Sequence, residues 1–318
     1  MSKCIRPPTS EDWHWKGFPM QHNLTDAELF TMASIDPRVV GRPEKYIPKL
    51  AFMFLTHGPL PLRPLWEEFF KGHEKYFSIY VHSNPESTQD FEQPSFFHGR
   101  MIPSQDVKWG DISLLDAERR LLGNALLDFT NERFILLSET CIPLHNFSVL
   151  YDYIIHSKHS FVGFTDDDGP VGKGRYNYNL EPEVTIDQFQ KAPQWFEVNR
   201  KLALSIVKDT KYYSKFNSFC KEICYPDEHY IVTFLQIKYA SDLANRSLTA
   251  ADWSRFEPHP LLYLEEDITY EFIKSLRDDI SCSYNDSPGH TCYMFARKFA
   301  QETLEPLLRL SHEILFNG

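Results

Sequence analysis

Residues 50–58 read LAFMFLTHG, an unbroken apolar run that ends in a polar turn. A short run of this kind is typical of a strand that is buried on both faces, as in a parallel sheet. Prolines then introduce a predicted helix over residues 65–71, and residues 77–81 (FSIYV) repeat the strand pattern. Because strand, helix and strand of these lengths form a βαβ unit, the sequence predicts an α/β fold.

The same alternation continues up to residue 156. A helix is predicted over residues 114–127, with Ser113 as its N-cap, and it is followed by a buried strand over 134–137 and a helix over 147–156. This order is typical of half of a nucleotide-binding domain. The charged residues Glu118, Arg119 and Arg120 are expected on the solvated face of the first helix.

Further along the chain the predicted elements are less regular. Residues 160–164 (SFVGF) and 195–198 (WFEV) have the pattern of strands, and helices are predicted over residues 200–210, 229–238, 266–278 and 303–315. Residues 1–47 are polar and contain prolines, with one short helix predicted near residues 25–34 from the capping pattern TDAE.

Two histidines directly follow the first two predicted strands. His57 lies in the turn after residues 50–55, and His82 follows residues 77–81. In open α/β sheets, ligands bind beyond the carboxyl ends of the strands. We therefore interpret both residues as candidates for ligand binding, with ordinary loop histidines as the alternative.

Residues 220–230 read CKEICYPDEHY and place Asp227, Glu228 and His229 in a row between aromatic and apolar flanks. Such a triplet is expensive to bury unless it is paired or used in function. This context makes Glu228 a candidate catalytic base. The alternative is an acidic residue in the first turn of a helix, where it interacts favourably with the helix dipole.

Asp166, Asp167 and Asp168 follow the predicted strand at 160–164. Three aspartates at such a position can hold a divalent metal that binds a diphosphate. The alternative, which we favour, is a solvated acidic turn that closes at Gly169. Next comes a flexible basic loop, GKGRY, in which Arg175 is suited to bind an anion.

Composition narrows the class of protein. The chain has 318 residues, a net charge of −11 and 15% aromatic residues. The negative charge argues against nucleic acid or an anionic membrane as the main partner. No run of about 18 apolar residues predicts a membrane span. Four N-x-S/T sequons, at Asn23, Asn146, Asn245 and Asn285, are weak support for a secretory compartment.

The six cysteines include no C-x-x-C pair, so a zinc ribbon is not expected. Cys282 and Cys292 flank SYNDSPGHT, a segment rich in turn residues. We predict that a disulfide between them closes a hairpin.

Several strings occur in an order that resembles plant core-2/I-branching-type glycosyltransferases, family 14, and in particular the brittle-culm-type branch. They are WGDISLLDAERRLLGNALLD, RFILLSETCIPL, GKGRY, QWFEV, YPDEHY, NRSLT, DWSR and FARKF, spread over about residues 25–315. The resemblance implies a GT-A type fold with a Rossmann-like mixed sheet flanked by helices. It also implies an inverting transfer from a UDP-sugar, N-acetylglucosamine or a related one, to a glycan or glycoprotein acceptor.

The resemblance further implies a domain division and a location. Residues 1–47 match a stem-like extension and residues 48–318 a single GT-A domain, with a nucleotide-binding half at about 48–160 and an acceptor and catalytic half at about 161–318. Family members are usually type II membrane proteins of the Golgi lumen, and the chain as given is expected to lack their N-terminal anchor. The resemblance does not name the acceptor, for which a plant cell-wall polysaccharide and an arabinogalactan protein glycan are the two candidates.

The resemblance assigns roles to individual residues. Glu228 matches the catalytic base. The expected nucleotide-sugar contacts are Thr56, His57, Gly58, His82, Ser83, Asn84, Trp109, Arg297 and Lys298. The expected acceptor contacts are Arg175, Tyr176, Trp195, Glu197 and Trp253.

No cofactor is expected besides the UDP-sugar, which is a co-substrate. Residues 138–141 (SETC) stand where metal-using GT-A enzymes carry an aspartate pair, and this sequence predicts that no divalent metal is required. Lys298 and Arg297 are then expected to stabilise the leaving diphosphate.

Two rival hypotheses stay open. Ala192-Pro193 and Phe256-Glu257 depart from the usual plant pattern, which leaves a catalytically inactive carbohydrate-binding relative as an alternative. The second rival is a metal-dependent transferase that uses the three aspartates at positions 166–168. The sequence names neither the donor sugar nor the acceptor.

Overall fold

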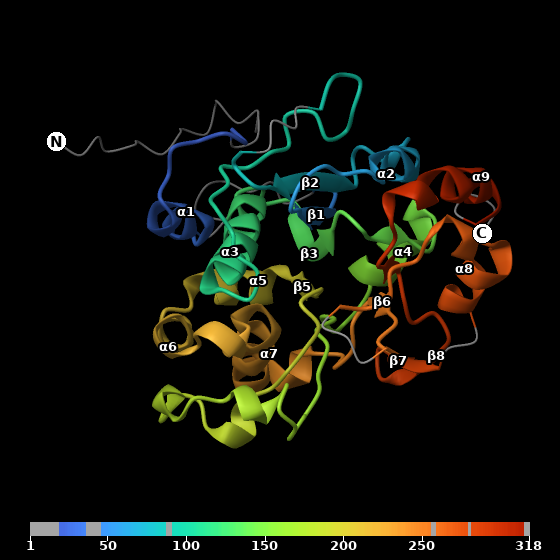
Figure 1. Ribbon diagram of the computed structural model, residues 1–318. Coiled ribbons are helices and arrows are strands. Elements are labelled where there is room, and N and C mark those ends of the chain that lie inside the picture. The colour runs from blue at the N-terminus through green and yellow to red at the C-terminus, as the bar shows by residue number, and fades with distance from the viewer. Residues whose placement is uncertain (1–18, 36–45, 87–90, 256–258, 279–280, 315–318) are drawn as a thin grey trace.

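A four-stranded sheet in the order β2-β1-β3-β5 forms the centre of the computed structural model, which describes residues 19–35, 46–86, 91–255, 259–278 and 281–314 (Figure 1). The strands are β1 (Lys49–Leu55), β2 (Phe77–His82), β3 (Asn131–Ser138) and β5 (Glu197–Asn199). β1 pairs in parallel with β2 and β3, whereas β5 pairs antiparallel with β3. The predicted mixed sheet of an α/β fold is therefore confirmed.

The register of the sheet brings three strand ends together. Leu55 at the end of β1 lies opposite His82 on one side and opposite Ser138 on the other. The residues that follow β1, β2 and β3 consequently lie together beyond the carboxyl ends of these strands. In open parallel α/β sheets, ligands bind at this end of the sheet.

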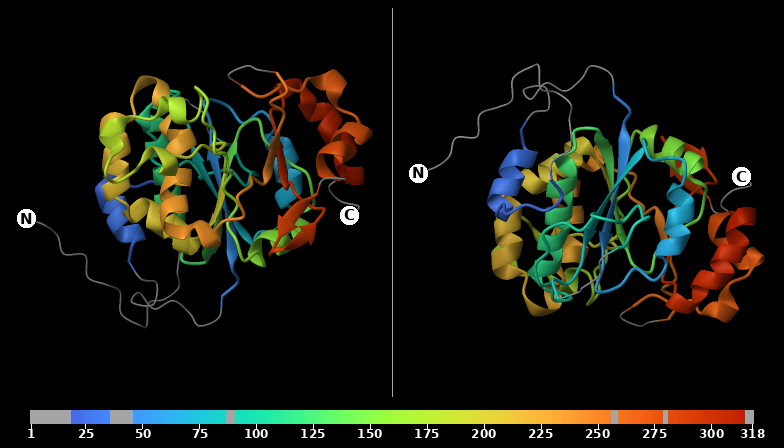
Figure 2. Two further views of the ribbon diagram at one scale, coloured as in Figure 1. Left: turned by 90° about the horizontal axis from the view of Figure 1, so that it is seen from below. Right: turned by 90° about the horizontal axis from the view of Figure 1, so that it is seen from above.

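Helices cover both faces of the sheet (Figure 2). Ala51, Met53 and Leu55 pack in the cluster that contains the helices of one face: α1 (Asp26–Ala33), α3 (Ile112–Leu126), α5 (Arg200–Lys208), α6 (Lys211–Phe219) and α7 (Pro226–Tyr239). Phe52 and Phe54 pack with α2 (Arg63–Phe70) and α4 (Phe147–Ile155) on the other face. Burial of both faces explains why the sequence of β1 is continuously apolar.

A smaller layer lies beside the main sheet at the C-terminal end of the chain. It consists of the sheet β4 (Ile142–Pro143), β9 (Phe295–Arg297) and β6 (Thr249–Ala251), the helices α8 (Tyr270–Arg277) and α9 (Leu304–Ile314), and the hairpin β7 (Cys282–Tyr284) and β8 (Ser287–Gly289). β9 pairs with β4, which follows β3 closely in the chain. Phe299 N–H also donates to the carbonyl of Thr140 at 3.0 Å. These contacts bring residues 297–299 to the ends of the central strands.

Several predicted boundaries differ from the structure. Asp111, not Ser113, is the N-cap of α3, because its side chain accepts the Ser113 amide hydrogen at 3.0 Å. The helix that we expected to begin at residue 229 begins at Pro226, and proline is well suited to a first helical position. Residues 160–164 do not form a strand, since only Ser160 and Phe161 make isolated bridges.

The predicted helix over residues 266–278 is α8 preceded by a separate 3₁₀ turn. Short 3₁₀ helices also connect the longer elements: η1 (Lys173–Arg175), η2 (Tyr178–Leu180), η3 (Ile186–Gln188), η4 (Glu222–Cys224), η5 (Ala240–Asp242), η6 (Glu265–Asp267) and η7 (Gln301–Thr303).

The charged run of α3 is buried, so the predicted solvated face is wrong. Glu118 is fully buried, and Arg119 and Arg120 are 4% and 5% exposed. Each has a partner from another element. Arg120 Nε pairs with Asp26 of α1 at 2.8 Å, Arg119 lies over the Tyr213 ring at 3.8 Å, and Glu118 accepts a hydrogen bond from the side chain of Gln194. α1, although it lies within residues 1–47, thus packs on α3 as part of the same hydrophobic cluster.

The predicted disulfide between Cys282 and Cys292 is confirmed, and it closes the β7–β8 hairpin. A second disulfide joins Cys220 and Cys224, which precede α7. Within the described ranges, no helix has the length and apolar character needed to cross a membrane.

Candidate active site

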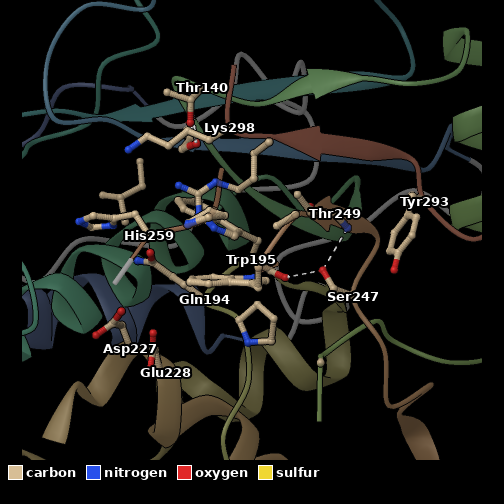
Figure 3. A pocket seen from close by; sticks show the side chains of 18 of the residues that line it. Thr140, Gln194, Trp195, Asp227, Glu228, Ser247, Thr249, His259, Tyr293 and Lys298 are labelled. Carbon is tan, nitrogen blue, oxygen red and sulfur yellow. Dashed lines mark hydrogen bonds between the residues drawn. The ribbon is translucent and has the colours of Figure 1, made fainter. Parts of the chain in front are cut away.

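One cavity of about 790 Å³ lies at the edge where β1, β2 and β3 end. Its lining includes ten of the fifteen residues that the sequence singled out for catalysis or substrate binding: Thr56, His57, His82, Asn84, Trp109, Trp195, Glu228, Trp253, Arg297 and Lys298. Figure 3 shows Asp227 and Glu228 on one side of this cavity and Lys298 with Thr140 on the opposite side. Residues 70 positions apart in the sequence therefore share one site.

The turns after β1 and β2 form one wall. The Thr56 amide donates to the carbonyl of His82 at 2.9 Å, which holds the two turns together. His82 is 1% exposed, and its Nε2 accepts the Gln105 amide hydrogen. Burial lowers the pKa of His82 to about 3, with a further contribution from the positive charge of Arg120. His82 is therefore neutral at physiological pH and offers ring nitrogens, not a charge.

The cationic wall comes from β9 and the residue after it. The Arg297 guanidinium lies 4.4 Å from the centre of the Trp195 ring, and burial lowers its pKa. In the part of the chain that the structure describes, neither Arg297 nor Lys298 forms an ion pair with a carboxylate. Two cations without a carboxylate partner, at the ends of the strands, form a site suited to an anion.

The acidic wall comes from the first turn of α7. Glu228 Oε2 accepts a hydrogen bond from Arg175 Nη1 at 2.6 Å and lies 3.6 Å from Lys191 Nζ. Arg175 itself stacks on the Tyr225 ring at 4.2 Å. Because only Oε2 makes these contacts, the other carboxylate oxygen stays available to a substrate hydroxyl. Arg175 lies outside the cavity lining and acts on the site through Glu228.

Two further carboxyl groups lie behind Glu228. Asp227 lines the cavity, and its Oδ1 is shielded from solvent without a hydrogen-bond partner. Burial raises the pKa of Asp227 to about 7, and the negative charge of Glu228 adds to this effect. Burial likewise raises the pKa of Glu118 well above its usual range, and the charge of Asp227 contributes. Burial therefore favours the protonated forms of Asp227 and Glu118 over their charged forms.

The raised pKa of Asp227 predicts a specific dependence of stability on pH. Between about pH 4 and pH 7 the folded protein keeps a proton that the unfolded chain has released, so the free energy of unfolding falls as pH rises through this window. The slope is at most about 1.4 kcal/mol per pH unit. In the Asp227→Asn variant this loss is expected to disappear. Urea denaturation of both proteins from pH 4 to pH 8 measures it, and parallel curves would contradict the assignment of the proton to Asp227.

Exposed aromatic side chains surround the opening. Trp109 is 57% exposed, and its ring contacts the rings of Tyr225 and His259 at 5.1 and 5.4 Å between centroids. Trp253 is 48% exposed. A ring that lines a cavity and keeps half of its surface in solvent is available for stacking on a sugar.

Five of the singled-out residues lie outside the cavity lining: Gly58, Ser83, Arg175, Tyr176 and Glu197. The Tyr176 hydroxyl donates to the carbonyl of Val184 at 2.6 Å, and its ring packs against Phe189. Glu197 is buried and pairs with Arg133 at 2.9 Å. The structure therefore gives Tyr176 and Glu197 contacts within the protein interior.

The three aspartates of the acidic turn also lie outside the cavity lining. Asp166 and Asp168 pair with Lys173 at 2.7 and 2.8 Å, and Asp167 Oδ1 accepts the Gly169 amide hydrogen. Their charges are thus used within the loop. Among the described residues, no group of three or more His, Cys, Asp or Glu side chains has an arrangement suited to a metal ion.

Sequence reasoning missed several residues of the site. Thr140, Gln194, Ser247, His259 and Tyr293 all line the cavity. Thr140, Gln194 and Ser247 stand in the strings SETC, QWFEV and NRSLT quoted above, and His259 stands between two prolines in the sequence, but no local pattern singled out these side chains. The Phe256-Glu257 departure lies outside the described residues. At the other departure, the Ala192 amide donates to the carbonyl of Glu228 at 2.9 Å, a contact that a non-proline residue retains.

A mixed α/β sheet with this cavity at its strand ends agrees with a GT-A-like glycosyltransferase, and comparison with known proteins defines the class further. Residues 50–277 match the family model described as Branch: Core-2/I-Branching enzyme. The chain belongs to the core-2/I-branching enzyme family of glycosyltransferases. It is similar to Glycosyltransferase BC10 of Oryza sativa subsp. japonica, with 34% identity over 309 residues, which cover 83% of this chain and 76% of that protein. The resemblance to the brittle-culm-type branch is thereby confirmed.

Proposed function

We propose that this glycosyltransferase moves a sugar, N-acetylglucosamine or a related one, from a UDP-sugar to a hydroxyl of a glycan or glycoprotein acceptor with inversion at the anomeric carbon. The observation that carries the proposal is the placement of Glu228 and Lys298 on opposite walls of one cavity. A carboxylate for the attacking hydroxyl and a cation for the leaving diphosphate are the two groups that this chemistry needs.

The reaction is a direct displacement. The acceptor oxygen attacks the anomeric carbon from the face opposite the diphosphate, and the C–O bond to UDP breaks as the new one forms. Glu228 takes the proton of the attacking hydroxyl. Lys298 and Arg297 offset the negative charge that develops on the departing UDP. We assign the binding of the nucleotide to Trp109 and to the turns after β1 and β2.

Arg175 gives the base a defined position. Its hydrogen bond to Glu228 Oε2 holds the carboxylate in a fixed orientation.

We also propose that no divalent metal takes part, so that Arg297 at the end of β9 and Lys298 after it neutralise the diphosphate. The pairing of Asp166 and Asp168 with Lys173 supports this reading over the metal-dependent alternative. The two disulfides support an oxidising compartment such as the Golgi lumen. Attachment to the membrane through an N-terminal anchor would follow from the family pattern.

A screen of UDP-sugars tests the proposal. The protein is incubated with UDP-N-acetylglucosamine, UDP-glucuronic acid and UDP-glucose, and both the melting temperature and UDP release are measured. We expect one donor to raise the melting temperature and to release UDP, with full activity in EDTA. A melting shift with no UDP release in the presence of any acceptor identifies the inactive carbohydrate-binding relative instead. If EDTA abolishes the activity, the protein is instead the metal-dependent transferase.

A further inference from the structure

Tyr225 stands directly before α7 and outside the cavity lining, yet two routes link it to the candidate base. Its backbone carbonyl accepts the Glu228 amide hydrogen at 3.0 Å. The guanidinium of Arg175 lies over its ring, 4.2 Å from the ring centroid, and Arg175 Nη1 donates to Glu228 Oε2 at 2.6 Å. The proposed chemistry does not use Tyr225, so these contacts call for a separate explanation.

The backbone of Tyr225 has a conformation that few residues with large side chains adopt. Its φ and ψ angles are 53° and 73°, in the left-handed region. Pro226 follows directly, and a proline disfavours the right-handed helical conformation for the residue before it. A left-handed tyrosine persists only where the surrounding structure fixes it, and such residues are concentrated at functional sites.

The Cys220–Cys224 disulfide fixes the chain directly before Tyr225. Its two cysteines stand four positions apart, and Cys220 is the C-cap of α6. Both are buried in the hydrophobic cluster that also contains residues of α6 and α7. The neighbour of Tyr225 in the chain is therefore tied covalently to the end of a packed helix, which limits the positions that Tyr225 can take.

Residues 109 and 110 fix the ring of Tyr225. The Trp109 ring meets it edge to face, with 5.1 Å between the centroids. Gly110 lies so close that a Cβ atom at this position would be 2.8 Å from Cε1 of the Tyr225 ring. Only glycine leaves room for this approach, and the φ of Gly110, +72°, also favours glycine. The ring is thus held by contacts that do not involve Arg175.

Arg175 benefits from a fixed ring, because its own backbone belongs to the glycine-containing loop GKGRY. Holding a long side chain in one conformation costs entropy, and the attraction between a guanidinium and a ring face offsets this cost. The side chain of Arg175 is 13% exposed, so water screens this attraction only in part. The ring on one contact and Glu228 on the other together define where the guanidinium lies.

We infer that Tyr225 is a positioning residue for the base. Its ring holds the Arg175 guanidinium, and through it the Glu228 carboxylate, in the orientation needed to take the proton of the attacking hydroxyl. This inference rests on the proposed role of Glu228 and deepens it. Because Tyr225 lies outside the cavity lining, its loss should lower kcat without weakening the binding of UDP.

A double-mutant cycle between Tyr225 and Arg175 tests the inference. Tyr225→Leu keeps an apolar side chain but removes the ring face, and it should lower kcat about tenfold, the effect of one lost cation–ring contact. In the Arg175→Met background the same substitution should have little further effect on kcat, because the cation that the ring holds is already absent. The affinity of Tyr225→Leu for UDP, measured by calorimetry, should stay close to that of the wild-type protein.

Three further variants accompany the cycle, and melting temperatures verify that each one folds. Tyr225→Phe keeps the ring and should retain most of the wild-type kcat. Tyr239→Leu is the matched control, since it removes a ring that lies 5.1 Å from Lys201 Nζ and outside the cavity lining, and it should leave kcat unchanged. If Tyr225→Leu does not fold, Tyr225→Met takes its place, because methionine is more flexible and adapts to irregular space.

The inference is overturned if the variant without the ring keeps the wild-type kcat, if Tyr225→Phe loses as much as Tyr225→Leu, or if the losses from Tyr225→Leu and Arg175→Met multiply in the double variant. Failure of the proposed function looks different. In that case the wild-type protein consumes no UDP-sugar, or Glu228→Gln keeps its kcat, whereas the same cycle measured by urea denaturation still shows coupling between Tyr225 and Arg175.

Discussion

Replacement of Glu228 by glutamine is expected to lower kcat by about 10²–10⁴-fold, the usual contribution of a general base. Glutamine has nearly the same shape and can still accept the hydrogen bond from Arg175 that the structure places at 2.6 Å. It cannot take a proton from the attacking hydroxyl. The loss should therefore fall on kcat, while the affinity for UDP stays close to that of the wild-type protein.

Steady-state kinetics with the donor identified in the UDP-sugar screen measure this effect, and calorimetry with UDP measures the affinity. Asp166→Asn is the matched control, because it also neutralises one carboxylate but lies outside the cavity lining. An active Glu228→Gln variant would show that another group, of which Asp227 is the nearest, takes the proton.

Replacement of Lys298 by methionine is expected to lower kcat/KM by about 10²–10³-fold, the cost of removing one preorganised group that stabilises developing charge. Methionine keeps the length of the apolar stem but removes the cation opposite Glu228. The charge of the leaving diphosphate is then met only by Arg297, whose guanidinium is stacked on Trp195. Because the same phosphates are present in the ground state, UDP should also bind more weakly.

Loss of UDP affinity distinguishes this variant from Glu228→Gln. Lys71→Met serves as the control, since Lys71 is an exposed lysine that follows α2 and pairs with Glu68 on the surface. If Lys298→Met binds UDP as tightly as the wild-type protein, Lys298 does not bind the diphosphate. A loss of UDP affinity in Arg297→Met would then assign diphosphate binding to Arg297. The two variants together thus separate proton transfer from stabilisation of the leaving group.

Local sequence patterns were sufficient for most of the fold. The runs that became β1, β2 and β3 are apolar because both of their faces are buried, and this property is visible in the sequence itself. The edge strand β5 and residues 160–164 were harder to predict from the sequence. A short apolar run does not show whether it will pair along its whole length, as a strand, or at single residues, as isolated bridges.

The burial of Glu118, Arg119 and Arg120 shows a limit of such patterns. A charged triplet in an amphipathic helix normally faces solvent. In this protein α1 packs on α3 and supplies Asp26, while the segment before β5 supplies Gln194. The partners lie tens of residues away in the sequence, so no local pattern could reveal them.

The candidate residues Glu228, Lys298 and Trp195 followed from the sequence by resemblance to a family, and their chemical types are suited to the proposed reaction. Only the tertiary structure decided their arrangement. β9 pairs with β4 and thereby carries Lys298 to the strand ends, α7 turns Glu228 toward it, and the disulfide hairpin closes the far end of the cavity. Secondary structure depends on neighbouring residues in the chain, whereas an active site depends on contacts between distant ones. The sequence alone therefore determined the three long strands and most of the chemically competent residues, and packing determined the cavity and the burial of Asp227.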